Sequence, residues 1–169
     1  VPYAVNDAMV FREYCVRTFG IPANQIKLVP NATAGMMHEQ LDWLLNMAST
    51  DPEAELFFYY SGHGNNDEAT KQAYLLPVDI TGKNIHLGIS LADLYQRLAT
   101  YPVKGAYVFL DACFSGGYKS AAPLLAQKGV RVVPKLGMPQ GHTISFSSSS
   151  GDQTSSVYHD KKQGYYTYF

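Results

Sequence analysis

The sequence contains few cysteines, and their spacing excludes two common kinds of small protein. Cys15 and Cys113 are the only two in 169 residues, too few for the disulfide framework of a small secreted domain. They form no Cys-x-x-Cys pair and lie in no His/Cys cluster, so the sequence does not predict a structural zinc site. Each cysteine is therefore either a buried apolar side chain or a reactive thiol.

Long apolar runs and blocks of one charge are also missing. No run approaches the roughly 20 apolar residues that cross a bilayer, and no signal peptide is visible. The sequence has 13 Lys and Arg and 14 Asp and Glu, which gives a formal net charge of −1, and it has no basic stripe. We therefore expect no nucleic-acid and no membrane partner, and the length and composition fit a single globular domain over residues 1–169.

Alternating helix and strand patterns predict an α/β sandwich around a mostly parallel sheet. The runs at 55–61 and 105–111 are almost continuously apolar, which is typical of central strands buried on both faces. Shorter strands are expected at 26–29, 74–77 and 143–149, and helices from Asn6 or Asp7 to about Phe19, after Thr33, after Ser90 and from 163 onward. Residues 62–72 and 114–142 read as polar, turn-rich loops.

Two predicted strands end in the same way, with small polar residues and glycine. They read "FFYYSGHG" at 57–64 and "VFLDACFSGG" at 108–117. Ligand sites in such sheets lie at the carboxyl ends of the strands, so we expect His63 and Cys113 to meet there if the strands are neighbours. An imidazole beside a thiol can take its proton and activate it as a nucleophile.

The other candidates have simpler interpretations. Cys15 shares a helical stripe with Phe11 and Phe19, which favours a place in the core. Four further histidines have no comparable context and are expected to be structural or exposed: His38, His86, His142 and His159. Asp7 suits a helix N-cap, and Asp111 suits a strand-end turn, so each carboxylate has a structural alternative to a functional role.

The motifs resemble those of the metacaspase and bacterial caspase-like cysteine peptidases. The resemblance begins with "YYSGHG" and "DACFSG" and extends, in the order of that group, over nearly the whole chain. The further blocks are "YAVNDA" at 3–8, "NATAGMMHEQLDWL" at 31–44, "YLLPVDI" at 74–80, "SSSSGDQTS" at 147–155 and "QGYYTYF" at 163–169.

The resemblance implies a caspase–haemoglobinase fold and a cysteine endopeptidase. It implies a catalytic dyad of His63 and Cys113, with the backbone amides of Gly64 and Cys113 as the oxyanion hole. It also implies that Asp7, Ser61 and Asp111 line the S1 pocket, which holds the residue before the scissile bond (P1). Two carboxylates in a confined pocket favour a guanidinium or ammonium group, so we expect protein or peptide substrates cleaved after Arg or Lys.

The sequence departs from the group in four places. The group's first strand, ahead of "YAVNDA", and its C-terminal apolar helix are absent from these 169 residues, and Gln163-Gly164 stands where His-Gly is usual. The loop after His63 offers only Asp67, Glu68 and the distant Asp79, fewer ligands than calcium needs. We therefore expect no metal and no organic cofactor, and calcium dependence stays open as the alternative.

Several questions stay open from the sequence. Lys119, Lys128, Arg131 and Lys135 lie in the 114–142 loop, which makes self-cleavage there a natural hypothesis. The alternatives to an Arg/Lys-specific peptidase are an inert caspase-like scaffold or a legumain-like peptidase of the same clan. A free thiol gives a slight preference for the cytoplasm, but the compartment and the oligomeric state remain open.

Overall fold

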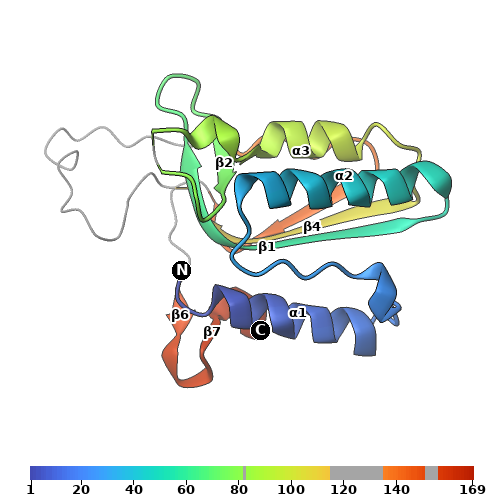
Figure 1. Cartoon of the computed structure of the whole chain (residues 1–169), viewed down its shortest axis with the longest axis horizontal. Coiled ribbons are helices and arrows are strands. Elements are labelled where there is room, and N and C mark those ends of the chain that lie inside the picture. The colour runs from blue at the N-terminus through green and yellow to red at the C-terminus, as the bar shows by residue number, and fades with distance from the viewer. Residues whose placement is uncertain (82, 115–134, 151–155) are drawn as a thin grey trace, which may run out of the picture.

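A mixed five-stranded sheet forms the centre of the molecule. The computed structural model describes residues 1–81, 83–114, 135–150 and 156–169. The strand order is β3-β2-β1-β4-β5; β1, β4 and β5 pair in parallel, whereas the short β2 pairs antiparallel with both β1 and β3. The strands are β1 (Glu55–Asn66), β2 (Ala73–Leu76), β3 (Ile89–Ser90), β4 (Gly105–Cys113) and β5 (Thr143–Ser147). Helices cover both faces (Figure 1), which confirms the predicted α/β sandwich.

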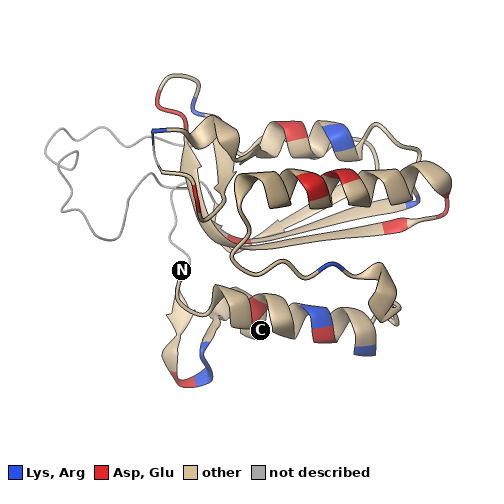
Figure 2. Cartoon of the chain, viewed as in Figure 1, with Lys and Arg blue, Asp and Glu red and all other residues tan. Residues whose placement is uncertain are grey.

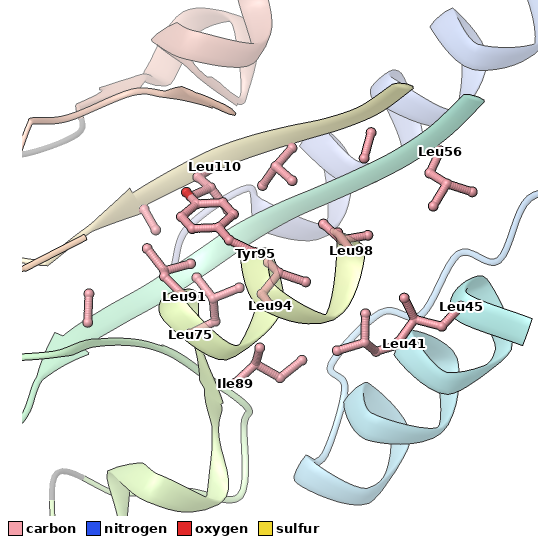
Figure 3. Close-up of a cluster of buried hydrophobic side chains, with 14 of the residues drawn as sticks. Leu41, Leu45, Leu56, Leu75, Ile89, Leu91, Leu94, Tyr95, Leu98 and Leu110 are labelled. Atoms are coloured by element: carbon pink, nitrogen blue, oxygen red, sulfur yellow. The ribbon is translucent and has the colours of Figure 1, made fainter. Parts of the chain in front are cut away.

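The main hydrophobic core lies on one face of the sheet, under α2 (Ala34–Thr50) and α3 (Leu91–Leu98). Alternate residues of β4 point into it, from Ala106 to Ala112. Leucines of both helices meet them (Figure 3). The hydroxyls of Thr33 and Ser90 accept hydrogen bonds from the first turns of α2 and α3, so each helix begins where the sequence supplies an N-cap.

The opposite face of the sheet is aromatic and is covered by α1 (Ala4–Arg17). The ring of Phe11 stacks on Tyr59 of β1 at 4.3 Å and lies 5.0 Å from Phe109 of β4. A hairpin of β6 (Val157–Tyr158) and β7 (Gln163–Gly164) leads into α4 (Tyr165–Tyr168). This C-terminal segment packs against α1 on the same side of the sheet (Figure 1).

The predicted strand at 26–29 is wrong. These residues follow a short 3-10 helix, Ala23–Gln25, and pair with no strand within the described part of the chain. The edge of β1 opposite β4 is likewise unpaired from Glu55 to Gly62 among the described strands, because β2 joins it only from His63 onward. A cavity of about 1110 Å³ runs between this edge, α1, α2 and the 20–32 segment.

The predicted boundaries of two elements are also corrected. Helix α1 starts at Ala4 and ends at Arg17, so Asp7 lies inside the first turns and is not the N-cap. Its amide donates to the carbonyl of Tyr3 at 2.9 Å. Strand β1 does not end at Ser61 but continues to Asn66, since β2 supplies a new antiparallel partner where the parallel pairing with β4 finishes.

The surface shows no dominant charge. Figure 2 shows acidic and basic residues interspersed over the helices and loops that are drawn in colour. No helix in the described residues combines the length and apolar character needed to cross a membrane. Most of the predicted 114–142 loop, including Lys119, Lys128 and Arg131, lies outside the described residues.

Candidate active site

The register of two parallel strands brings His63 and Cys113 together. In the pairing of β1 with β4, His63 is the direct partner of Cys113, and Ser61 is the partner of Asp111. Partners in neighbouring strands lie about 4.8 Å apart and point to the same face. His63 is exposed and Cys113 half-buried, so a substrate can reach an imidazole and a thiol placed side by side.

Close contacts hold the end of β1 against both of its neighbouring strands. The hydroxyl of Tyr60 lies 2.8 Å from the carbonyl of His63 and 2.8 Å from that of Leu76, which ties the histidine to the neighbouring strand. A Cβ at Gly64 would lie 2.5 Å from the Phe114 ring and 2.8 Å from the Cys113 carbonyl. Glycine is therefore required at 64 for the close approach of the two strands.

The three predicted pocket residues lie close together. Ser61 and Asp111 each come two residues before the imidazole or the thiol along their strands, and Asp7 reaches them from α1. Asp7 is 1% exposed and Asp111 6%. The Asp7 carboxylate accepts a hydrogen bond from the amide of Gly164 at 3.0 Å and one from the hydroxyl of Ser61 at 3.4 Å. The structure thus places Asp7, Ser61 and Asp111 in one cluster, although they come from α1, β1 and β4.

Two buried carboxylates give this cluster a strongly negative character. Burial raises the pKa of Asp7, and the charge of Asp111 raises it further, against hydrogen bonds from Gly164 and Ser61 that lower it. The nearby phenols respond to the same field: burial and then the charge of Asp111 raise the pKa of Tyr166 to about 12. A cation entering the cluster would neutralise charge that the fold pays a cost to bury.

Three residues of the cluster were not predicted from the sequence as site residues. Gly164 holds Asp7, and Thr167 donates to Asp111 at 3.3 Å. Tyr59 in turn lies 2.6 Å from the Thr167 hydroxyl. The two-residue period of a strand gave a signal for Tyr59, because positions 59, 61 and 63 point to the same face. No periodicity marks Gly164 or Thr167, which reach the site through a tertiary contact.

The remaining candidates have structural roles. Cys15 is buried, as its helical stripe predicted, and burial raises the pKa of its thiol. His142 lies 3.1 Å from the Val103 carbonyl and His38 lies 3.3 Å from that of Leu87. His159 approaches the hydroxyl of Tyr3 at 3.3 Å.

Two of the three carboxylates considered for calcium are used in local structure. Asp67 accepts hydrogen bonds from the amides of Ala69 and Thr70. Asp79 accepts a hydrogen bond from the amide of Ala34 at the start of α2. In the part of the chain that the structure describes, no group of three or more His, Cys, Asp or Glu residues is arranged to hold a metal ion.

Comparison with known proteins points to one protein family. Residues 2–169 match the family model of the caspase domain. Metacaspase-2 of Arabidopsis thaliana is 28% identical over 174 residues, which cover 89% of this chain and 41% of the plant protein. A probable protease of a Desulfuromonadales bacterium is 22% identical over 129 residues, which cover 65% of this chain and 16% of the bacterial protein. The chain thus spans less than half the length of either relative.

Proposed function

The chain belongs to the caspase family of peptidases, and on that premise we propose that it is a cysteine endopeptidase that cleaves after Arg or Lys. One observation carries the proposal: the β1–β4 register that pairs His63 with Cys113 also pairs Ser61 with Asp111. Reactive and acidic side chains therefore share one face of the sheet, two residues apart along the strands.

In the proposed reaction, His63 accepts the proton of the Cys113 thiol, and the sulfur attacks the carbonyl carbon of the scissile bond. The backbone amides of Gly64 and Cys113 donate to the oxyanion that forms. Protonated His63 then gives its proton to the departing amine, leaving a thioester on Cys113. Water activated by His63 hydrolyses the thioester, which restores the free thiol.

The acidic cluster selects the side chain before the scissile bond. Asp7 and Asp111 approach from different elements, and a guanidinium can bind both through charge-assisted hydrogen bonds. Ser61 supplies a further polar contact at the wall. No bound metal or organic cofactor enters this scheme, and the substrates are proteins or peptides with a basic residue before the cut. Self-cleavage at the basic residues of the 114–142 loop is part of the same proposal.

A panel of peptides that differ only in the residue before the scissile bond tests the proposal. The panel contains Arg, Lys, citrulline, Asp and Asn and is read with and without calcium. We expect cleavage after Arg and Lys, little after citrulline, none in Cys113→Ala, and unchanged rates in the matched control Cys15→Ala if that variant keeps its melting temperature. Fragments that still accumulate from Cys113→Ala would refute self-cleavage.

Each other result selects a different function. Cleavage after Asp or Asn would keep the dyad and reject the acidic pocket, as for a legumain-like peptidase. No cleavage, together with no labelling of Cys113 by a thiol-reactive peptide, would indicate an inert scaffold. Cleavage only with calcium would overturn the expectation that no metal is needed.

A further inference from the structure

We infer that Thr167 is a positioning residue that fixes the Asp111 carboxylate and thereby sets a preference for Arg over Lys. The inference rests on the proposed function, because it concerns the pocket for the basic residue. The inference goes beyond the proposed function by assigning a role to a side chain that touches neither the thiol nor the imidazole. Thr167 lies in α4, more than fifty residues along the chain from its two partners.

The directions of the hydrogen bonds follow from counting protons. Thr167 has one hydroxyl proton, which it donates to Oδ2 of Asp111 at 3.3 Å. The phenol of Tyr59 lies 2.6 Å from the same hydroxyl oxygen, so Tyr59 must be the donor in that second bond. The result is a directed chain from Tyr59 through Thr167 to the carboxylate.

Both ends of this chain are held by rigid elements. The ring of Tyr59 is stacked against Phe11 at 4.3 Å and belongs to the central strand β1. Asp111 lies in β4 and is buried. Thr167 is three residues beyond Gly164, whose amide holds Asp7. One short C-terminal segment therefore orients both carboxylates of the pocket.

The shapes of the two basic side chains determine the consequence. A guanidinium is a planar fork that binds a carboxylate through two parallel hydrogen bonds, so it benefits from a carboxylate fixed in one plane. An ammonium is a compact charge with rotatable donors and tolerates a carboxylate that turns. Loss of the Thr167 bond should therefore weaken Arg binding more than Lys binding.

The test compares Thr167→Val, which keeps the shape and removes the hydroxyl, with Thr167→Ser, which keeps the hydroxyl. We expect Thr167→Val to lower kcat/KM for Arg peptides about tenfold through KM, the size expected for one hydrogen bond to a charged group. We expect the Arg-to-Lys ratio of kcat/KM to fall severalfold. Thr167→Ser should restore the ratio, and the rate of Cys113 alkylation by iodoacetamide should stay unchanged.

Tyr59→Phe provides a second, independent variant. It removes the first donor of the chain but leaves the Thr167 hydroxyl beside Asp111, so the Arg-to-Lys ratio should fall by a smaller factor. An equal loss for Arg and Lys peptides in both variants would overturn the inference and show a purely structural role. Failure of the unsubstituted chain to cleave after any basic residue is a separate result, which would refute the proposed function and this inference with it.

Discussion

Replacing Asp7 by Asn should stabilise the fold while it removes activity toward Arg peptides. The carboxylate of Asp7 is 1% exposed, and both its burial and the charge of Asp111 raise its pKa. Within the described residues, Asp7 forms no ion pair. A charge buried in this way costs folding free energy that a neutral side chain of the same shape does not.

The size of the gain follows from the contacts that Asn can keep. Its carbonyl can accept the Gly164 amide, now bound at 3.0 Å, and its amide group can donate to the Ser61 hydroxyl. What disappears is the cost of burying the charge and the repulsion from Asp111. Relief of this kind commonly contributes about 0.5–2 kcal/mol, and about 1 kcal/mol corresponds to a rise in Tm of roughly 2–4 °C for a chain of this length.

The pH dependence has a definite sign. A carboxyl whose pKa is raised on folding binds its proton more tightly in the folded state, so its contribution to stability falls as pH rises from the unfolded pKa, about 3.9, through the raised folded one. The advantage of Asn over Asp should therefore be full at neutral pH. It should shrink as the pH is lowered through the raised pKa toward about 4.

Thermal unfolding at pH 7.5 and pH 4.5, together with cleavage of an Arg peptide, checks this reasoning. The exposed Asp160→Asn is the matched control and should change stability by less than about 0.5 kcal/mol. A lower melting temperature for Asp7→Asn at pH 7.5 would refute the argument, since it would mean that the charge of Asp7 is well compensated in the folded protein.

Three further substitutions test the site, the main core and a helix cap in turn. Gly64→Ala should cost about 1–3 kcal/mol by overpacking against Phe114 and the Cys113 backbone, and chemical denaturation with thiol labelling will show whether the strand ends separate. Leu94→Ala, at a side chain 0% exposed in the core, should cost about 2–5 kcal/mol in urea unfolding; a loss below 1 kcal/mol would contradict the packing described. Thr33→Ala should cost about 1 kcal/mol by removing the bond to the Met36 amide, and Thr33→Ser should restore it.

The sequence predicted the parts of the site that depend on strand geometry. His63 and Cys113 each follow a buried apolar run, so the rule that sites lie at the carboxyl ends of strands predicts that they meet. It also predicted that Asp7, Ser61 and Asp111 would cluster, through the family resemblance. The strand end itself was misread, because glycine and asparagine at 62–66 resemble a turn, whereas β2 supplies a partner that keeps them in the sheet.

The features that were missed depend on contacts between distant segments. The segment 26–29 has the composition of a strand, but a strand exists only with a hydrogen-bonded neighbour, and none lies beside it in the described chain. Asp7 has the residue type of an N-cap, but the helix begins three residues earlier at Ala4. Thr167 has no local pattern at all, because its role is set by Tyr59 and Asp111, which no rule of sequence spacing places beside it.

The half-paired edge of β1 should be visible in amide hydrogen exchange. Successive amides of a strand point to opposite edges, so from Glu55 to Gly62 every second one points toward β4 and the others toward the cavity, where no described strand pairs with them. Slow and fast exchange should therefore alternate along this stretch. The alternation should end at His63, which pairs with Cys113 on one side and Leu76 on the other. His63 is thus the first residue of β1 that is paired with a neighbouring strand on both sides.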